Sequence, residues 1–205
     1  PVIEVVSEDD LIKRGYILPV EVEIINVKHT QYKGKSYNAR YKKQIVNNNH
    51  RNSLICEAYE KHPDKQRIIL VKEISHGEIL SRMLGIPFIH GSSKERRNAL
   101  DLFKQKKISA LIASPILKQG VDIPEAEVLI LAHGGSAPID IIQKIGRVRR
   151  PAPGKRCGTI IDFFDYCPTE ENDFFTQQAY KRLTIYKSKN FAVCQLELNT
   201  SPKAS

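Results

Sequence analysis

The chain has 205 residues, 41% of them hydrophobic, which is enough length and apolar content to bury a substantial core. Its 32 Lys and Arg residues against 23 Asp and Glu give a formal net charge of +9, which favours a polyanionic partner. No apolar run has membrane-spanning length, and an acidic N-terminal stretch (Glu4, Glu8, Asp9, Asp10) is unlike a signal peptide. We therefore expect a soluble intracellular protein, cytoplasmic or in the nucleoid or nucleus, and not a secreted or membrane protein.

The N-terminal part of the chain predicts a short helix, a strand and a basic segment. The helix covers residues 8–14, and the strand, with alternating apolar residues, covers 20–27. Residues 28–43 are rich in Lys, Tyr, Gly and Asn and predict an exposed basic loop. This loop could contact nucleic acid, or it could be an insertion that is only solvated, and both interpretations stay open. A helix is expected over residues 45–59.

Strand-like and helix-like segments alternate through the middle of the chain. The apolar runs that predict strands buried on both faces are Arg67–Val71, Pro87–His90, Ser109–Ser114, Glu127–Ala132 and Gly158–Phe164. Helices are expected between them, one capped by Ser75 with Glu78 in a capping box, another after Ser93. The alternation predicts an α/β fold with a mainly parallel sheet between helices. Ligands of such sheets bind at the carboxyl ends of the strands, where we expect the functional residues.

Two more helices and a last strand complete the predicted elements. The helices cover residues 138–149 and 173–187, and the strand covers 191–198. Residues 200–205 predict a disordered tail. The four cysteines (Cys56, Cys157, Cys167 and Cys194) are widely spaced, without a Cys-x-x-Cys pair or a Cys/His cluster. We expect reduced thiols, no disulfide framework and no metal site.

The segment from Gln143 to Arg150 reads Gln-Lys-Ile-Gly-Arg-Val-Arg-Arg and is the strongest indication of chemistry in the sequence. Arg147 and Arg150 are three residues apart, so they project from the same side of a helix. Guanidinium groups can bind phosphate oxygens bidentately, and Gly146 leaves room for a close approach. The segment indicates binding of a nucleotide phosphate, with a solvated basic face as the alternative.

Two weaker patterns follow predicted strands. Ser114 is followed by a Gly-x-Asp-x-Pro turn in which Gly120 and Asp122 could meet a sugar, and Ser114 a phosphate. An ordinary turn capped by the aspartate explains the same residues. His90 and Gly91 lie between a strand and a helix N-terminus, which can bind an anion. A helix cap with a turn glycine is the alternative there.

The order and spacing of these patterns resemble the second RecA-like domain of superfamily 2 helicases. The resemblance is best over residues 67–165, where residues 68–84 match motif IV, 114–124 motif V and 143–150 motif VI. Residues 174–198 resemble the tail of the same domain. The Gln-led motif VI is closer to DNA repair, recombination and phage-type helicases than to the His-led RNA helicases. The resemblance implies a RecA-like, P-loop NTPase-type three-layer sandwich.

The resemblance also implies roles at the nucleotide. Arg150 corresponds to the arginine finger that stabilises charge at the γ-phosphate of ATP, and Arg147 to its companion. Asp122 corresponds to a ribose contact, for which Gly120 leaves room. Gln143 would link the nucleotide to the interface between domains.

At the nucleic acid, the resemblance implies a backbone contact by Ser114, which stands where the family often has Thr. His90, Gly91 and Lys72 are further candidates to bind the same strand. DNA is the expected partner in preference to RNA.

The chain lacks two features of a complete helicase motor. It contains no G-x-x-x-x-G-K-S/T phosphate loop and no Asp-Glu box for Mg²⁺. In this family both belong to the N-terminal RecA-like domain, which we expect to hold ATP and Mg²⁺. We therefore expect a C-terminal fragment in which residues 1–27 are the interdomain segment with the strand leading into the domain, and residues 28–199 are the helicase C-terminal RecA-like domain.

The expected function is that of the C-terminal motor domain of an ATP-dependent superfamily 2 helicase or translocase. Alone, the chain should not hydrolyse ATP at a significant rate. Two alternatives stay open: a nucleic-acid-binding RecA-like module without ATPase activity, and the motor half of a restriction or remodelling translocase.

Overall fold

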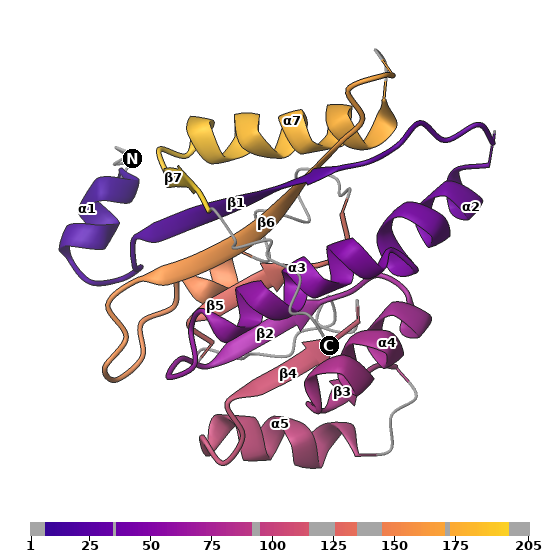
Figure 1. Ribbon diagram of the computed structural model, residues 1–205. Helices are drawn as coiled ribbons and strands as arrows, with labels where there is room; N and C mark the ends of the chain where they lie inside the picture. Colours follow the sequence, from indigo (N-terminus) through magenta and orange to yellow (C-terminus); the bar gives the residue numbers. More distant parts are fainter. Residues whose placement is uncertain are drawn as a thin grey trace.

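The computed structural model describes residues 7–34, 36–91, 95–114, 126–134, 145–170 and 173–196. These residues form a seven-stranded sheet with the strand order β3-β4-β2-β5-β6-β1-β7 (Figure 1). The strands are β1 (Val20–Lys28), β2 (Arg67–Leu70), β3 (Phe88–Ile89), β4 (Ala110–Ala113), β5 (Val128–Leu131), β6 (Gly158–Tyr166) and β7 (Ala192–Gln195). Each pair of neighbouring strands is parallel. The structure confirms the α/β fold with a parallel sheet.

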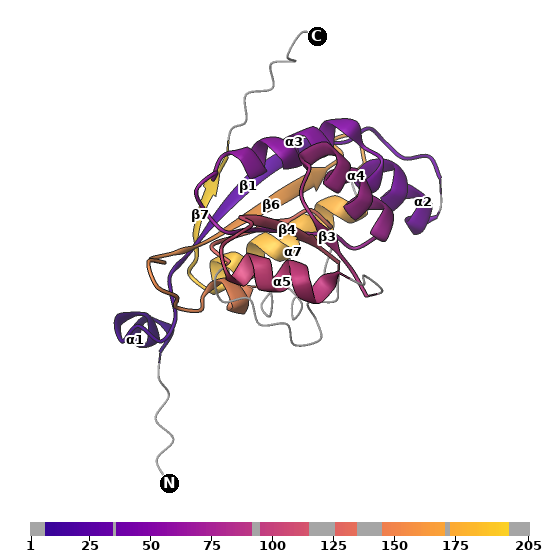
Figure 2. The same ribbon diagram turned by 90° about the horizontal axis from the view of Figure 1, so that it is seen from below.

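Helices cover both faces of the sheet. They are α1 (Glu8–Lys13), α2 (Tyr37–Tyr41), the π-helical turn η1 (Lys42–Val46), α3 (Asn49–Glu60), α4 (Ile74–Leu84), α5 (Arg96–Lys104) and α7 (Phe174–Ser188). Figure 2 shows α3 and α4 on one side of the strands and α5 and α7 on the other, so the molecule has three layers. No helix in the described part of the chain is long and apolar enough to cross a membrane.

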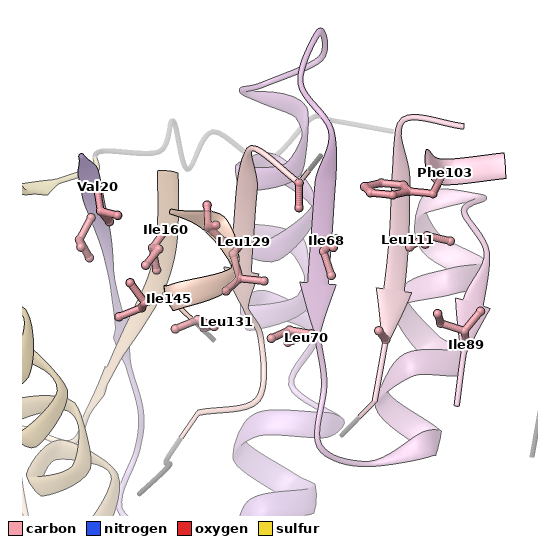
Figure 3. Close-up of a cluster of buried hydrophobic side chains, with 14 of the residues drawn as sticks. Val20, Ile68, Leu70, Ile89, Phe103, Leu111, Leu129, Leu131, Ile145 and Ile160 are labelled. Carbon is pink, nitrogen blue, oxygen red and sulfur yellow. The ribbon is translucent and has the colours of Figure 1, made fainter. Parts of the chain in front are cut away.

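The central strands supply both hydrophobic cores because successive side chains point to opposite faces. Ile68 and Leu70 of β2 belong to the core under α5 and α7, whereas Ile69 belongs to the core under α3 and α4. Figure 3 shows Ile68 and Leu70 on the same side of the sheet as Leu129 and Leu131 of β5. This double burial explains why these strands are continuous apolar runs.

Residues 145–148 are helical and pack into the core on the α5 and α7 side. Ile145 and Val148 are both buried, and Val148 lies against the start of β6, where Gly158 leaves it room. The rest of the helix expected over 138–149 lies outside the described residues, apart from Arg149, which is in a turn. The arginine-rich segment, residues 143–150, therefore packs on the sheet through Ile145 and Val148.

The expected capping box of the helix after β2 is wrong. That helix, α4, begins at Ile74, and its N-cap is Glu73, whose side chain makes no capping hydrogen bond. Glu73 has extended backbone geometry, so the helix begins two residues earlier than it would with Ser75 as its N-cap. The second expected cap, Ser93, lies outside the described residues.

The segment expected to be an exposed basic loop over residues 28–43 is partly helical. Ser36 caps α2 by accepting a hydrogen bond from the Ala39 N–H, and the chain continues through η1. Arg40 and Tyr41 are buried. Their partners lie far along the chain, at the start of α7 and after β5, so local composition could not show their burial.

The last strand is shorter than expected. β7 covers Ala192–Gln195 and pairs only with β1 among the described strands, and its side chains are exposed. The tail over residues 200–205 lies outside the described residues. α7 occupies nearly the predicted range, with Asp173 as its N-cap. Arg182 and Tyr186 of α7 both donate hydrogen bonds to the buried Asp162 of β6, at 2.8 and 2.7 Å.

We expect Gly158→Ala to lower the free energy of unfolding by about 1–3 kcal/mol, because it overpacks the contact between β6 and the arginine-rich segment. A Cβ at Gly158 would lie 2.8 Å from the Val148 carbonyl oxygen, a backbone atom that cannot rotate away. Gly146→Ala is the matched control, since a Cβ there meets no atom of the described residues within 4 Å. Urea denaturation measures both variants. Equal stability of the two variants would contradict this packing.

Candidate functional site

Three of the predicted nucleic-acid contacts lie at the carboxyl edge of the sheet. Lys72 follows β2 after one residue, His90 follows β3, and Ser114 follows β4. Because the strands are parallel and β4 lies between β3 and β2, the three residues lie in one row at this edge. Gly91, next to His90, is exposed. These residues therefore lie at the edge of the sheet that the sequence predicts.

The surroundings of these residues differ. Ser114 is buried, and its N–H donates to the Ile89 carbonyl at 3.1 Å, so this N–H is used by the sheet and cannot also hold a phosphate. The ring of His90 is half-buried and lies 5.2 Å from the ring of Phe88, measured between centroids. Lys72 is exposed. The ammonium group of Lys72, in the same row as Ser114, is therefore accessible to a polyanion.

The arginine-rich segment ends at the opposite edge of the sheet. The Arg149 carbonyl accepts a hydrogen bond from the Leu18 N–H at 2.8 Å, just before β1 begins, and Val148 lies against Gly158, the first residue of β6. The expectation that all functional residues lie at the carboxyl ends of the strands is wrong for Arg147 and Arg150. Because β5 and β6 are parallel, the chain that connects them must run back from the carboxyl edge to the amino edge of the sheet. The arginine-rich segment is the last part of that connection.

Within the segment, buried and accessible side chains alternate with helical spacing. Ile145 and Val148 are buried, Arg147 is half-buried and Arg150 is exposed. Partial burial lowers the pKa of the Arg147 guanidinium. A Cβ at Gly146 would meet none of the described atoms, so the backbone there is open to a close approach.

The third arginine of the segment has a structural role that the sequence did not indicate. The Arg149 guanidinium donates to Glu8 of α1 at 2.8 Å and to the Leu18 carbonyl at 3.2 Å, and it lies 5.4 Å from the ring centroid of Phe191. Lys189 also donates to Glu8, at 3.3 Å. Burial raises the pKa of the Glu8 carboxyl, but Arg149 and Lys189 outweigh it and lower the pKa overall. Arg149 thus ties α1 to the end of the arginine-rich segment.

Three predicted nucleotide contacts cannot be compared with this geometry. Gly120, Asp122 and Gln143 lie outside the described residues.

A buried ion-pair network at the carboxyl edge was also missed from the sequence. Asp165 of β6 accepts hydrogen bonds from Arg51 of α3, with Nε to Oδ1 at 2.8 Å and Nη2 to Oδ2 at 3.1 Å. His29, which follows β1, lies 2.8 Å from Asp165 Oδ1 through its Nε2. Arg51 and Asp165 are almost completely buried. Burial raises the pKa of the Asp165 carboxyl, but the Arg51 charge and the His29 hydrogen bond outweigh it and bring the pKa down to about 2.

This network also holds the chain that leaves β5. Arg51 Nη1 donates to the Ala132 carbonyl at 2.7 Å, and the Tyr41 hydroxyl donates to the His133 carbonyl at 2.6 Å. Gly134 has a φ of +49°, and a Cβ there would lie 3.3 Å from Asp165 Oδ2. Residues 132–134 are therefore fixed to α2, α3 and β6 at the point where the chain sets out toward the arginine-rich segment.

Among the described residues, no group of three or more His, Cys, Asp and Glu side chains could hold a metal ion. The described thiols are free, with Cys167 buried and Cys194 exposed.

We expect Asp165→Asn to lower the free energy of unfolding at neutral pH by about 3–5 kcal/mol, because the buried Arg51 charge would lose its partner. The folded pKa of Asp165, about 2, lies below its ordinary value of 3.8, so its stabilisation is present above 3.8 and is lost as the pH falls toward 2. The stability curves of the wild type and the variant should therefore converge by about 2 kcal/mol over that pH window. Asp101→Asn, at an exposed site, is the control. Parallel curves would contradict the network.

We expect Glu8→Gln to release α1 without disturbing the core, because α1 has no buried residue and Glu8 binds both Arg149 and Lys189. Amide hydrogen exchange measured by mass spectrometry should become faster over residues 8–14 and stay unchanged in β5 and β6. The control is Asp9→Asn, at an exposed position of the same helix. Unchanged exchange in α1 would show that the ion pairs do not hold it.

Known proteins share this sequence and architecture. Residues 50–152 match the sequence model of the helicase conserved C-terminal domain. The putative DNA 3'-5' helicase Rad25 of Halobacterium salinarum is 27% identical over 203 residues, which is 95% of this chain and 32% of that protein. The ATP-dependent rRNA helicase RRP3 of Candida albicans is 28% identical over 124 residues, or 57% of this chain and 23% of that protein. The chain thus spans a third or less of these relatives.

The crystal structure of T4 UvsW matches the fold with a TM-score of 0.67 at 19% identity, covering 88% of this chain and 42% of that one. The family match covers half of the chain and includes Ser114, Arg147 and Arg150. The chain therefore belongs to the helicase conserved C-terminal domain family, and its fold is the RecA-like α/β fold of the superfamily 2 helicases that its motifs resemble.

Proposed function

We propose that the chain is the C-terminal motor domain of an ATP-dependent superfamily 2 helicase or translocase, and that it supplies arginines to an ATP site held mainly by another domain. The observation that carries the proposal is the arginine-rich segment. Ile145 and Val148 seat it on the sheet, while Arg150 is exposed and Gly146 is open. The chain has guanidinium groups for a phosphate but no phosphate loop of its own.

In this proposal the N-terminal RecA-like domain of the same polypeptide binds ATP and Mg²⁺. Arg150 is the arginine finger and Arg147 its companion, and both stabilise charge that develops at the γ-phosphate. Gly120 and Asp122 contact the ribose, and Gln143 connects the nucleotide to the domain interface. A rigid base supports the arginines, because Val148 packs against Gly158 and Arg149 is bound to Glu8 and Leu18.

Nucleic acid lies along the carboxyl edge of the sheet in this proposal, in contact with Ser114, His90, Gly91 and Lys72. We propose DNA as the substrate in preference to RNA. The Gln-led motif and the relative named as a DNA helicase support DNA, whereas the relative named as an rRNA helicase supports RNA. Backbone contacts of this kind make binding sensitive to salt.

We also propose that residues 1–27 carry the connection from the first motor domain and lead into β1, and that residues 28–199 form the second. The ion pairs of Glu8 support this division, because they dock α1 beside the arginine-rich segment rather than in the core. Movement of residues 1–27 would then shift the arginine-rich segment. An intracellular location, in the cytoplasm, nucleoid or nucleus, follows from a nucleic-acid substrate.

We expect Arg150→Ala in the full-length protein to lower kcat for ATP hydrolysis by about 1,000-fold, because the arginine finger acts chiefly in the transition state. The Kd for ATP should change by less than about 10-fold, since the other domain holds most of the nucleotide. Arg156→Ala is the matched control, because Arg156 is also exposed and lies only six residues further along the chain.

Steady-state ATPase assays with saturating single-stranded DNA measure the three proteins. If the wild-type protein hydrolyses ATP and Arg150→Ala retains the wild-type kcat, the arginine-finger role is wrong. If Arg156→Ala loses as much activity as Arg150→Ala, the effect reflects general loss of positive charge.

A further inference from the structure

The stretch from Ile24 to Cys56 contains no Asp or Glu but seven Lys and Arg residues. Two of these are buried in ion pairs with acids from elsewhere, Arg40 with Asp173 and Glu170, and Arg51 with Asp165. The exposed members among the described residues are Lys28, Lys33, Lys42 and Lys43. Their charge has no acidic counterpart within the stretch, so this part of the surface favours an anionic partner.

Two partly exposed aromatic rings lie on α2 and at the start of α7, and Lys42 and Lys43 directly follow α2 in the chain. We call Tyr37 and Phe174 the α2 platform. The two rings meet edge to face with centroids 5.0 Å apart, although they come from α2 and from the start of α7. Phe174 is 42% exposed, and Tyr37 is partly exposed. Buried rings support them, because Tyr41 and Phe175 are almost fully buried and each lies within about 6 Å of Tyr37.

Contacts of Arg40 join the two elements that carry the α2 platform. The Arg40 guanidinium donates to Gln44 at 2.7 Å, to Glu170 at 3.1 Å and to Asp173, and it lies 5.2 Å from the ring centroid of Phe175. Asp173 also accepts the Thr176 N–H at 2.7 Å as the N-cap of α7. Arg40 therefore joins α2 to the start of α7, and a ligand need not order these rings on binding.

The α2 platform adjoins the row of residues at the carboxyl edge. Lys72 Nζ lies 5.3 Å from the ring centroid of Tyr37 and 5.0 Å from that of Tyr41. Lys72 follows β2, the neighbour of β4, which Ser114 follows. A strand of nucleic acid that contacts both Ser114 and Lys72 would therefore also reach Tyr37.

Three acidic groups lie near this surface among the described residues: Asp173 and Glu170 bind Arg40, and Glu73 lies near Tyr37. Burial, and to a lesser degree the nearby Glu73 carboxylate, raise the pKa of the Tyr37 hydroxyl. Glu73 is a single negative charge and lies next to Lys72 in the chain, whereas Lys42 and Lys43 directly follow α2. The balance of charge around α2 is positive.

We propose that the α2 platform is a further binding site for single-stranded nucleic acid, in which a base stacks on Tyr37 and Phe174 and phosphates bind Lys42 and Lys43. Every base has an aromatic face, so such a site binds without sequence preference. The inference rests on the proposed function, because it extends the same nucleic-acid path from the carboxyl edge onto α2. For residues 28–43 the sequence allowed either a nucleic-acid contact or a solvated insertion. This proposal favours the nucleic-acid contact.

The test is equilibrium binding of fluorescein-labelled single-stranded oligothymidylate to the full-length protein, followed by anisotropy over a series of salt concentrations. Tyr37→Leu and Phe174→Leu remove the aromatic faces but keep apolar volume, and each should raise Kd about 5- to 100-fold. Tyr16→Leu is the control, since Tyr16 is an exposed tyrosine before β1, at the other edge of the sheet. Circular dichroism melting confirms that each variant is folded.

The lysines are tested separately by Lys42→Gln with Lys43→Gln, a pair of exposed changes that spare the packed rings. The slope of log K against log salt concentration should fall by about 0.7 for each lost phosphate contact. The matched control is Lys104→Gln with Lys107→Gln. Both lysines are exposed; Lys104 is the last residue of α5, and Lys107 follows the helix.

The outcomes separate this inference from the function on which it rests. Failure of the wild-type protein to bind the oligonucleotide overturns both. Normal wild-type binding with unchanged Kd in both leucine variants and an unchanged salt slope in the lysine variant overturns the α2 platform alone. Displacement of the oligonucleotide by polyglutamate at equal charge concentration shows a general polyanion surface, and it also overturns base stacking.

Discussion

The ion pair between Asp165 and Arg51 is the interaction on which the carboxyl edge depends. The pair joins β6 to α3, and Arg51 also binds the chain that leaves β5. His29, which follows β1, contacts the same buried carboxylate. A buried charge is tolerated only when it is fully paired, so these elements must arrive together for the fold to be stable. Because Arg51 also holds the Ala132 carbonyl, the connection toward the arginine-rich segment leaves from a fixed point.

The two proposed ligands meet opposite ends of this frame. Nucleic acid would lie along the carboxyl edge, near Lys72 and Ser114, while the arginines proposed to face ATP lie near the amino edge, beside α1. The link between these ends is the connection from β5 to β6, which is tied down at Ala132 by Arg51 and at Arg149 by Glu8 and Leu18. In the proposed function the nucleotide cleft lies at the Arg149 end of this connection and the nucleic-acid path at its Ala132 end, so the connection couples the two ligands.

Much of the fold could be predicted from short-range patterns, and most of the buried polar network could not. The strands around Ile69, Ile112 and Ile130 are recognisable because burial on both faces demands continuous apolar runs. Arg51, Arg149 and Arg182 look like surface charges in the sequence, yet their acidic partners lie 114, 141 and 20 residues away. For the same reason the segment around Arg40 was expected to be a loop. The motifs predict a role for Arg147 and Arg150 in chemistry, but only the return of the chain between parallel strands places them at the amino edge.

In the proposed function, Arg150 acts on a nucleotide held by another domain. The most direct measurement is a crystal structure of the full-length protein with single-stranded nucleic acid and ADP–beryllium fluoride, which mimics the γ-phosphate. We expect Arg150 to donate to a fluoride at about 3 Å, with the phosphates otherwise bound by a phosphate loop outside this chain. An ADP–beryllium fluoride bound with Arg150 facing solvent, or one bound by this chain alone, would contradict the proposed role of Arg150.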